Sequence, residues 1–481
     1  MKKILFALGI AFFALSCSQD AVFRVKNVCA DGSSLVTDKI QKVIDACAEA
    51  GGGVVSLPKG DYLVGTLNLR DNVEFHFENG ARLVATTDTT KYQTHNEQKA
   101  GIFYSEDCDN IAITGDGTIF GNGMAFMTEQ VKASTNDDIV KYSRQGEAFK
   151  GSYEGVGDGP LLADEVRYHQ MLVFSNCTNV LLRDFTCIDS PYWCFVIVHC
   201  DRVTIEHLRI DNNLLIPNGD GVDIISTSNV NMSDCDFSCG DDAIVLAGYQ
   251  WHYGDPGFKR IERPMHNVNI TNCNLRSRSS AIRIGGWDQN PMSDFNLSNI
   301  NIYDSNCGIG LCIRDTAGVS NINFTNFNIH TRLHSSGDWW GNGEPVKITA
   351  MRDAPNHKPG KVSDLHFTNI NTYGENSIII WADDDAEIEN VYFDNFDFNL
   401  SQSPFNASVG GNFDFRPTGH PELGIFKHNT PVVCVHNAKN VRFTNGTMTM
   451  DETCRSDNFV SVFESENAPE LSLKDVKQIK K

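Results

Sequence analysis

A short motif recurs from about residue 110 to the C-terminus, in which a polar residue precedes alternating apolar and polar positions. Val180 and Val203 are 23 residues apart, Val203 and Val230 are 27 apart, and Leu365 and Val391 are 26 apart. Repeats of this length, built from short alternating segments and turn residues, are typical of a solenoid in which each repeat stacks on the next. The copies begin at Asn110, Asn179, Arg202, Asn229, Asn267, Asn321, Asp364, Asn390 and Asn440.

This pattern predicts an all-β fold, a single-stranded right-handed parallel β-helix. The alternation places Val and Ile in the core and Asn and Thr outside. Segments of helical periodicity are missing from the repeats, which favours a β-helix over an α-solenoid or a propeller. We expect Asn side chains near the turns to stack into ladders, and one domain to span residues 22–481.

The start of the predicted domain differs from the repeats. Residues 37–50 carry Ile40, Val43, Ile44 and Cys47 at helical spacing after a polar stretch, which predicts a short capped helix. Residues 54–62 then read as a strand, a turn and a second strand. We expect the helix to cover the open end of the coil.

Four long insertions interrupt the repeat, and loops carry function more often than scaffold does. In a β-helix they would wall a groove beside one sheet without forming separate domains. The insertions are residues 116–168, 247–265, 330–345 and 400–432.

Two acidic clusters lie about one repeat apart. The first is Asn218-Gly219-Asp220-Gly221-Val222-Asp223-Ile224, and the second contains Asp241 and Asp242 after Gly240, so Asp241 follows Asp220 by 21 residues. If the chain advances by one strand spacing of about 4.8 Å per coil, these carboxylates become neighbours. Crowding raises one pKa, so that one carboxyl can act as general acid while another is the base. Alternatively, Asn, Asp and Gly here only form turns.

Basic residues follow the acidic clusters on the predicted outward face. If Ile224, Ile244, Ile284, Ile313 and Ile348 point inward, alternation turns their neighbours outward. Arginine and lysine there suit a sugar that bears a carboxylate or sulfate. Alternatively, they are solvated strand positions. The two interpretations have equal weight for Arg283 and Lys347, whereas substrate binding is favoured for Arg314. The outward residues are Asp223, Arg283, Cys312, Arg314 and Lys347.

The third insertion contains Trp339 and Trp340 in a Gly-rich stretch. Aromatic side chains pack well on the C–H faces of sugars, so Trp340 is a candidate substrate-binding residue. Alternatively, at least one of these tryptophans pins the loop onto the scaffold. Glu344 is a reserve candidate for an acid.

Charge and cysteine content narrow the class of protein. The chain of 481 residues has a net charge of −21, which excludes a nucleic-acid partner because phosphate binding needs a basic face. Its 15 cysteines are scattered and lack paired metal spacing, so we predict no metal site and no cofactor. Some disulfides are compatible with an exported protein, whereas several cysteines fit as small apolar core residues.

The N-terminus reads as an export signal. Two lysines follow Met1, an apolar run covers residues 4–15, and Ser16-Cys17 follows. The run is too short to span a bilayer as a stable helix. The segment resembles a bacterial lipoprotein signal of residues 1–17, with Cys17 as the lipidated residue; an ordinary signal peptide cut nearby is the alternative. We therefore expect an exported monomer, in the periplasm or at the cell surface, that touches the membrane only through its lipid anchor.

The two acidic clusters resemble the Asn-Thr-Asp and Gly-Asp-Asp motifs of the polygalacturonases, glycoside hydrolase family 28, at that family's spacing. The resemblance implies hydrolysis of an α-linked galacturonic-acid-containing glycan, such as polygalacturonan or rhamnogalacturonan, with inversion at the anomeric carbon. It implies that Asp241 is the general acid and that Asp220 and Asp242 activate water. Asn218 falls in the first motif and is a candidate substrate-binding residue.

Two departures from the family pattern bear on the substrate. Ser280 stands where the family has the histidine of Gly-His-Gly, and Cys312-Ile313-Arg314 stands for Arg-Ile-Lys. In one interpretation, Arg283 replaces part of the role of the missing histidine and arginine. In the others, the substrate differs from plain polygalacturonate, or activity is lost. The three intact aspartates make loss the weakest of these interpretations.

Two other functions remain open. A polysaccharide lyase on the same fold would use Ca²⁺ held by carboxylates and an Arg or Lys base, and its product would absorb in the ultraviolet. A surface glycan-binding protein would bind without releasing sugar.

Overall fold

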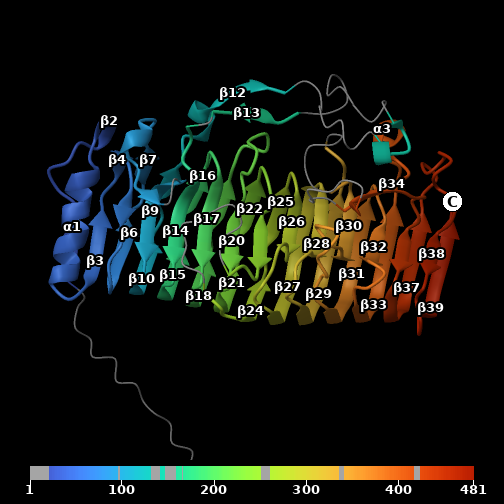
Figure 1. The fold of residues 1–481 in the computed structure, drawn as a ribbon. Coiled ribbons are helices and arrows are strands. Elements are labelled where there is room, and N and C mark those ends of the chain that lie inside the picture. The colour runs from blue at the N-terminus through green and yellow to red at the C-terminus, as the bar shows by residue number, and fades with distance from the viewer. Residues whose placement is uncertain are drawn as a thin grey trace, which may run out of the picture.

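The computed structural model describes residues 21–95, 98–131, 141–146, 159–164, 166–250, 261–334, 341–415 and 423–481. The predictions for Cys17 and for Trp340 lie outside these ranges. Within them, parallel strands step along one axis from the N-terminal to the C-terminal end (Figure 1). The chain is a right-handed parallel β-helix, as the repeat predicts.

One parallel sheet forms a single face of the coil. In the described part of the chain it has 13 strands, and each parallel strand pairs with the strand one coil earlier. The antiparallel β8 (Thr94–His95) joins it through β9. In order along the axis the parallel strands are β5 (Leu67–Asn68), β9 (Gln98–Glu106), β14 (Gln170–Ser175), β17 (Trp193–Val198), β20 (Val222–Ile225), β23 (Ile244–Ala247), β26 (Ser280–Ile284), β28 (Cys307–Ile313), β30 (Glu344–Ala350), β32 (Ile378–Ala382), β36 (Val433–His436) and β38 (Phe463–Glu466).

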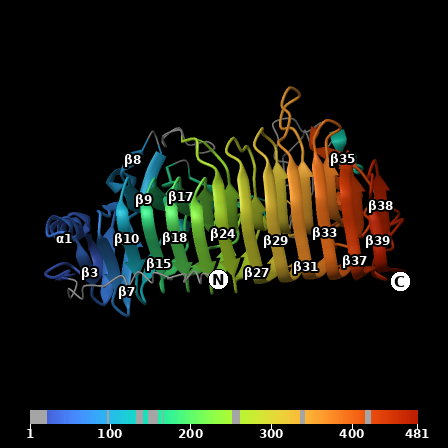
Figure 2. The same cartoon turned by 90° about the horizontal axis from the view of Figure 1, so that it is seen from below.

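A second sheet of 22 described strands closes the rest of the coil. In the first half, two short strands per coil form it; from β27 onward one long strand replaces each pair, as both β24 and β25 align with β27 (Figure 2). Its strands are β1 (Val22–Arg24), β2 (Asp31–Leu35), β3 (Gly53–Leu57), β4 (Gly60–Val64), β6 (Val73–Phe77), β7 (Ala81–Ala85), β10 (Asp109–Thr114), β11 (Thr118–Phe120), β15 (Thr178–Arg183), β16 (Thr186–Ile188), β18 (Asp201–Glu206), β19 (Arg209–Asp211), β21 (Ser228–Ser233), β22 (Asp236–Cys239), β24 (Met265–Thr271), β25 (Asn274–Ser277), β27 (Met292–Ser305), β29 (Val319–Thr331), β31 (Val362–Gly374), β33 (Ile388–Leu400), β37 (Ala438–Met450) and β39 (Ser472–Lys480).

The core lies inside the coil, where equivalent side chains of successive coils stack. Phe324, Phe367, Phe393 and Phe443 form one such column, with ring centroids 4.4, 4.3 and 5.1 Å apart and planes within 10° of parallel. Each aromatic ring removes a large apolar area from water, so these columns tie neighbouring coils together. All five isoleucines predicted to point inward lie in this core.

The first residue of each repeat copy has a structural role that explains the preference for Asn. All nine residues adopt left-handed backbone with φ between 52° and 59°, a conformation that Asn tolerates better than most residues. Their side chains bond from coil to coil: Asn179 Nδ2 donates to Asn110 Oδ1 at 2.7 Å, and Asn110 Nδ2 donates to Asn72 Oδ1 at 2.9 Å. The predicted ladders are therefore confirmed.

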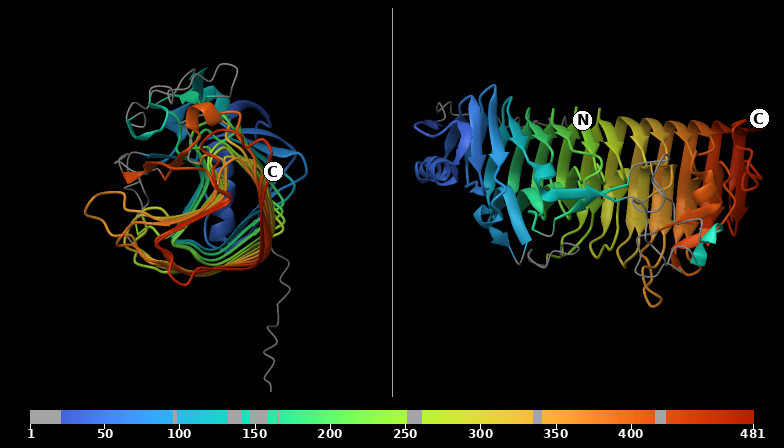
Figure 3. Two further views of the ribbon diagram at one scale, coloured as in Figure 1. Left: turned by 90° about the vertical axis from the view of Figure 1, so that its right-hand side faces the viewer. Right: turned by 90° about the horizontal axis from the view of Figure 1, so that it is seen from above.

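The predicted N-terminal helix is α1 (Thr37–Glu49), with Ile40, Ile44 and Cys47 buried against the first coils. Viewed along the axis, it covers the end of the coil (Figure 3). Its caps are made by the backbone: Val36 at the N-cap makes no side-chain hydrogen bond, and the amide of Ala50 at the C-cap donates to the Ala46 carbonyl. Among the described residues, no helix has the length and apolarity to cross a membrane. The 14 described cysteines are all free, and 12 of them are buried.

Two insertions meet on the same side of the coil (Figures 1 and 3). The first contains η2 (Gly123–Phe126), the antiparallel pair β12 (Met127–Gln130) and β13 (Leu161–Ala163), and residues 141–146; η1 (Thr89–Lys91) lies earlier in the chain. The last contains α3 (Asn406–Val409) and the hairpin of β34 (Asn412–Asp414) and β35 (Ile425–Lys427). They clasp each other, since the Arg144 amide donates to Asn412 Oδ1 at 2.7 Å and Gln145 Nε2 to the Gly410 carbonyl at 2.6 Å.

Candidate active site

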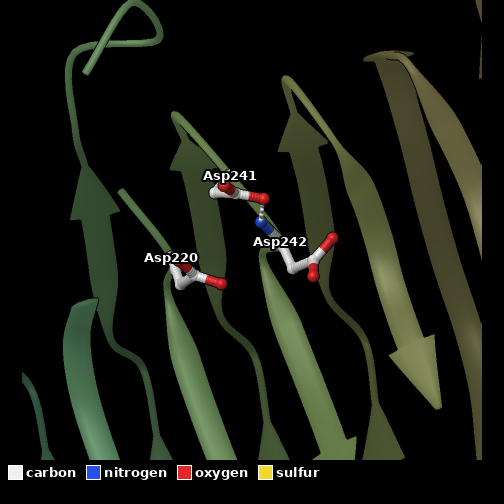
Figure 4. Close-up of side chains that lie close together, drawn as sticks. All are labelled: Asp220, Asp241 and Asp242. Carbon is white, nitrogen blue, oxygen red and sulfur yellow. Dashed lines mark hydrogen bonds between the residues drawn. The ribbon is translucent and has the colours of Figure 1, made fainter. Parts of the chain in front are cut away.

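The three predicted catalytic aspartates meet where the interior strands β20 and β23 of the 13-stranded sheet begin. Asp220 precedes β20 and Asp242 precedes β23, and Val222 aligns with Ile244, so Asp220 and Asp242 hold equivalent positions one coil apart. One carboxylate oxygen from each of Asp220, Asp241 and Asp242 lies within 4.8 Å of the other two (Figure 4). The spacing in the sequence therefore brings the carboxylates together, as predicted.

Close backbone packing holds the two acidic turns against each other. The Gly221 amide donates to the Asp242 carbonyl at 2.9 Å. A Cβ on Gly221 would lie 2.3 Å from the Ala243 carbonyl oxygen, and one on Gly240 would lie 2.4 Å from the Ile216 carbonyl oxygen. Glycine is needed at both positions because any side chain would push the turns, and with them the carboxylates, apart.

Asp242 has a hydrogen-bond donor at one oxygen and an ion-pair partner at the other. The Ser280 amide donates to its Oδ1 at 2.8 Å, and Arg283 Nη1 lies 3.3 Å from its Oδ2. Charge-assisted contacts of this kind favour a negative charge on the carboxylate. Asp241 Oδ1, in turn, accepts the Asp242 amide at 3.0 Å.

Burial and mutual repulsion set the protonation of the other carboxyls. Burial, and next to it the charge of Asp242, raises the pKa of Asp241 to about 7. Burial and the neighbouring carboxylates raise the pKa of Asp220 well above its ordinary value, and burial does the same for the pKa of Asp223. Neither oxygen of Asp223 accepts a hydrogen bond from the residues that the structure describes. The cluster therefore holds protons at pH values where exposed aspartates have lost them.

Arg283 is the cation of this cluster. It points outward from β26, is 8% exposed, and also donates from Nη2 to the Tyr249 hydroxyl at 3.3 Å. Burial opposes its charge, but Tyr249, Asp242 and Asp223 together raise the pKa of Arg283 above its ordinary value. A permanent guanidinium charge thus lies against Asp242 and close to Asp223, on the side of the cluster away from Asp220.

Comparison with known proteins identifies the family of the chain. The family described as glycosyl hydrolases family 28 matches residues 164–403, about half of the chain and the part that contains the three aspartates. The chain belongs to this family.

Relatives and solved structures point the same way. A probable polygalacturonase of Arabidopsis thaliana is 33% identical over 131 residues, which are 24% of this chain and 29% of that protein. A polygalacturonase of Gossypium hirsutum is 25% identical over 307 residues, 59% of this chain and 67% of that protein. The chain thus spans less than a third of the first relative and about two thirds of the second. The structure of a Yersinia enterocolitica family 28 exopolygalacturonase has the same fold, with a TM-score of 0.65 and 18% identity over 96% of this chain and 78% of that one.

The other predicted site residues fall in two groups. Ser280 lies in the site and serves it through its backbone amide, which bonds Asp242. Asn218 takes left-handed backbone with φ 56° just before Asp220. In contrast, Arg314 and Lys347 are 1% and 3% exposed, beneath the β34–β35 hairpin. Arg314 Nη2 donates to the Phe415 carbonyl, and Lys347 Nζ donates to the Asp414 carbonyl at 3.3 Å.

Cys312 and the reserve acid also lie outside the carboxylate cluster. Arg283 aligns with Gly310 on the next strand, and Gly310 aligns with Lys347 on the strand after it, so Lys347 and Arg283 are in one row across the sheet. Cys312 aligns with Thr349, two positions further along the strands. Glu344 is fully buried; its Oε2 accepts the Asn342 amide, and its Oε1 lies 3.7 Å from Lys347 Nζ. Burial opposes the charge of Lys347, but Glu344 raises the pKa of Lys347 above its ordinary value. The structure therefore does not bring Arg314, Lys347 or Glu344 to the aspartates.

Arg167 is the residue of the site that sequence reasoning missed. Its Nη1 donates to the carbonyls of Pro191 and Pro217 at 2.7 and 2.9 Å, and its Nη2 donates to Asn218 Oδ1 at 3.2 Å. Its guanidinium also lies 4.4 Å from the ring centre of Tyr192. Arg167 thereby ties the turn before β17 to the turn that carries Asp220.

A metal ion is the other species that three clustered carboxylates attract. Among the described residues, Asp220, Asp241 and Asp242 are the one group with three ligand atoms close enough for a cation. However, the guanidinium of Arg283 already provides positive charge at Asp242. A divalent ion there would be repelled at short range, so the donor set fits acid–base chemistry better than a resident metal.

Proposed function

We propose that this family 28 protein hydrolyses α-linked, galacturonic-acid-containing pectic glycans by acid–base catalysis with inversion. Asp241 protonates the leaving oxygen, and Asp220 and Asp242 position and activate the attacking water. The observation that carries this proposal is the division of charge within the cluster: Asp242 is paired with Arg283, while the pKa of Asp241 is raised to about 7. An acid with this pKa keeps its proton at mildly acidic pH and can still transfer it.

Two criteria for the stereochemistry disagree. Inverting enzymes commonly hold their two carboxyls roughly 6.5–9.5 Å apart. The nearest oxygens here lie within 4.8 Å, closer to the spacing of retaining enzymes. We follow the family and propose inversion, because the rule describes pairs and this site has three carboxyls. Proton NMR of the first product decides: the inverted β-anomer is expected before mutarotation, and an initial α-anomer would mean a covalent intermediate.

We also propose that the enzyme cuts near chain ends. The β34–β35 hairpin covers the outward face at β28 and β30, where Arg314 and Lys347 bond its carbonyls. A glycan at the aspartates therefore extends toward β17 and β14, not toward β30. The solved structure from Yersinia enterocolitica is described as an exopolygalacturonase. Mono- or disaccharides should accordingly appear from the first minutes, with little loss of viscosity; a ladder of long oligomers would indicate internal cleavage.

The decisive experiment compares wild type with Asp241→Asn on a panel of pectic and other acidic polysaccharides. Reducing-sugar release and ultraviolet absorbance are read in parallel, and Asp236→Asn, an exposed carboxyl on β22, is the matched control. Loss of a general acid should lower the rate by roughly 10²–10⁴-fold, without new absorbance. Absorbance that needs calcium would establish a lyase. Binding without release by wild type, unchanged in Asp241→Asn, would establish a glycan-binding protein.

A further inference from the structure

A cavity lies on the outward face of the 13-stranded sheet, against its last strands, of which β32 and β38 are labelled in Figure 1. It has a volume of about 460 Å³ and is formed by β32, β36 and β38 together with His428, which follows β35. We call it the C-terminal cavity. Five strand spacings of about 4.8 Å separate β36 from β23, which places the cavity roughly 24 Å along the axis from the aspartates.

The β34–β35 hairpin lies between the two sites. Its carbonyls bond Lys347 on β30 and Arg314 just after β28, and its aromatic side chains Phe413 and Phe426 pack on Trp381 of β32. The cavity is therefore a separate site and not a continuation of the surface around Asp241.

Aromatic contacts fix the cavity walls. The ring of His436 stacks on Trp381 with centroids 3.9 Å apart and planes at 18°, and the ring of His428 stacks on Phe413 at 4.4 Å and 16°. Trp381 and His428 also meet edge to face at 5.6 Å. Two imidazoles are thus held in fixed orientations, which lowers the entropic cost of binding a ligand.

The polar groups of the cavity are carboxylates and imidazoles. His436 Nδ1 lies 3.3 Å from Glu466 Oε2, and His428 Nε2 lies 3.9 Å from Glu464 Oε2. His428 Nδ1 donates to the Asn429 carbonyl at 2.7 Å. Burial lowers the pKa of His436, so its ring is neutral at neutral pH. Trp381, Cys434, Val435 and Ser465 complete the described lining, which includes neither Lys nor Arg.

These charges decide which ligand fits. The Glu464 and Glu466 side chains are 27% and 80% exposed. A uronate or sulfate would be repelled by their like charges, and the described lining has no Lys or Arg to offset this repulsion, so an anion is disfavoured. A divalent cation is disfavoured because, among the described residues, the aspartate cluster alone brings three ligand atoms together. Hydroxyl groups remain as ligands for this lining, because carboxylates accept two hydrogen bonds from neighbouring hydroxyls, and imidazoles donate or accept.

We propose that the C-terminal cavity is a second carbohydrate site, which binds an uncharged sugar unit. Pectic glycans that carry neutral side chains present both chemistries in one molecule. The site would hold such a substrate on the enzyme while the aspartates act on its acidic backbone. The identity of the ligand as part of a pectic substrate rests on the proposed function, whereas binding of a neutral sugar does not.

The test is calorimetric titration of the full chain carrying Asp241→Asn, so that no sugar is cleaved. The probes are galactotriose, arabinotriose and trigalacturonate, each to about 10 mM. At least one neutral trisaccharide should bind, and adding Glu464→Gln with Glu466→Gln should weaken that binding at least tenfold. The matched control is Glu387→Gln with Glu389→Gln, two carboxylates beside and on β33 that should leave binding unchanged. His436→Gln gives a second, independent loss, and thermal melting confirms that each variant is folded.

Two results would overturn the proposal: no neutral trisaccharide binds, or binding is insensitive to both the glutamate and the His436 variants. Trigalacturonate bound at the cavity would reverse the assigned ligand class and also overturns it. The glutamate variants, made in the active enzyme, should keep wild-type hydrolysis of unbranched polygalacturonate. Failure of the proposed hydrolysis would appear in wild type and leave the titration unaffected, so the two ideas fail separately.

Discussion

Two stretches of the same sheet face present charged side chains in the same row, with opposite outcomes. On β20 and β26, Asp223 and Arg283 point outward beside the three catalytic candidates; both are buried, and Arg283 contacts Tyr249 and Asp242. On β30, Lys347 stands in the same row and bonds the carbonyl of Asp414. Alternation decides which way a side chain points, but the groups packed over it decide whether that side chain joins the carboxylate cluster or holds an insertion to the scaffold.

The two stretches also differ in how their charges are balanced. Beside the hairpin, Lys347 and Glu344 form a matched pair, and both are buried. In the site, four carboxyls outnumber the guanidinium groups of Arg283 and Arg167, and the pKa of Asp241 is raised to about 7. Such a cluster loses stability as pH rises, because the folded state must release protons that the unfolded state has already lost. The site therefore stores electrostatic strain. The stretch of β30 that lies under the hairpin, with Lys347 and Glu344, does not, and we call it the covered stretch.

The largest expected effect comes from the covered stretch. Lys347→Met leaves Glu344 as a buried, unpaired carboxylate, which should cost about 3–5 kcal/mol of the free energy of unfolding. Chemical denaturation of wild type and variant measures it. The double variant Lys347→Met with Glu344→Gln removes both charges and should recover most of the loss. A stable Lys347→Met protein with a strongly raised KM would show instead that Lys347 binds substrate.

Next in size is the cation of the site. Arg283→Gln removes the positive charge beside Asp242 and should lower kcat by about 100-fold, while Arg283→Lys restores part of it. Because Arg283 lowers the pKa of Asp241, its removal should also shift the alkaline limb of the pH–rate profile upward from about 7.

The matched control for this prediction is Arg276→Gln, an arginine of β25 that pairs with Asp304 outside the site. It should change neither kcat nor the pH profile. An Arg283→Gln enzyme with an unchanged alkaline limb would disconnect Arg283 from Asp241, and Arg283 would then only support the fold.

The sequence predicts what periodicity controls. Strand alternation correctly orients Asp223, Arg283 and Lys347, and one repeat of separation correctly joins Asp220 to Asp242. Periodicity carries no information about contacts between an insertion and a distant coil. The cover over Lys347 therefore could not be predicted. For the same reason, Arg167 was not predicted. It lies at the end of an insertion and contacts the site through Tyr192 and two backbone carbonyls, and the repeat pattern does not encode such contacts.

The smallest effect is expected from removing metal ions, because Arg283 already provides positive charge beside Asp242. A cation held by Asp220, Asp241 and Asp242 would sit next to the guanidinium that already neutralises Asp242, and the two positive charges would repel. Dialysis against EDTA should thus change the rate of reducing-sugar release by less than about twofold, and added Ca²⁺ should not raise it. In Arg283→Gln the repulsion is gone, so Ca²⁺ should bind there and protect the variant against thermal unfolding. Calcium-dependent activity in wild type would mean that the carboxylates are metal ligands, and that the guanidinium belongs to a lyase site.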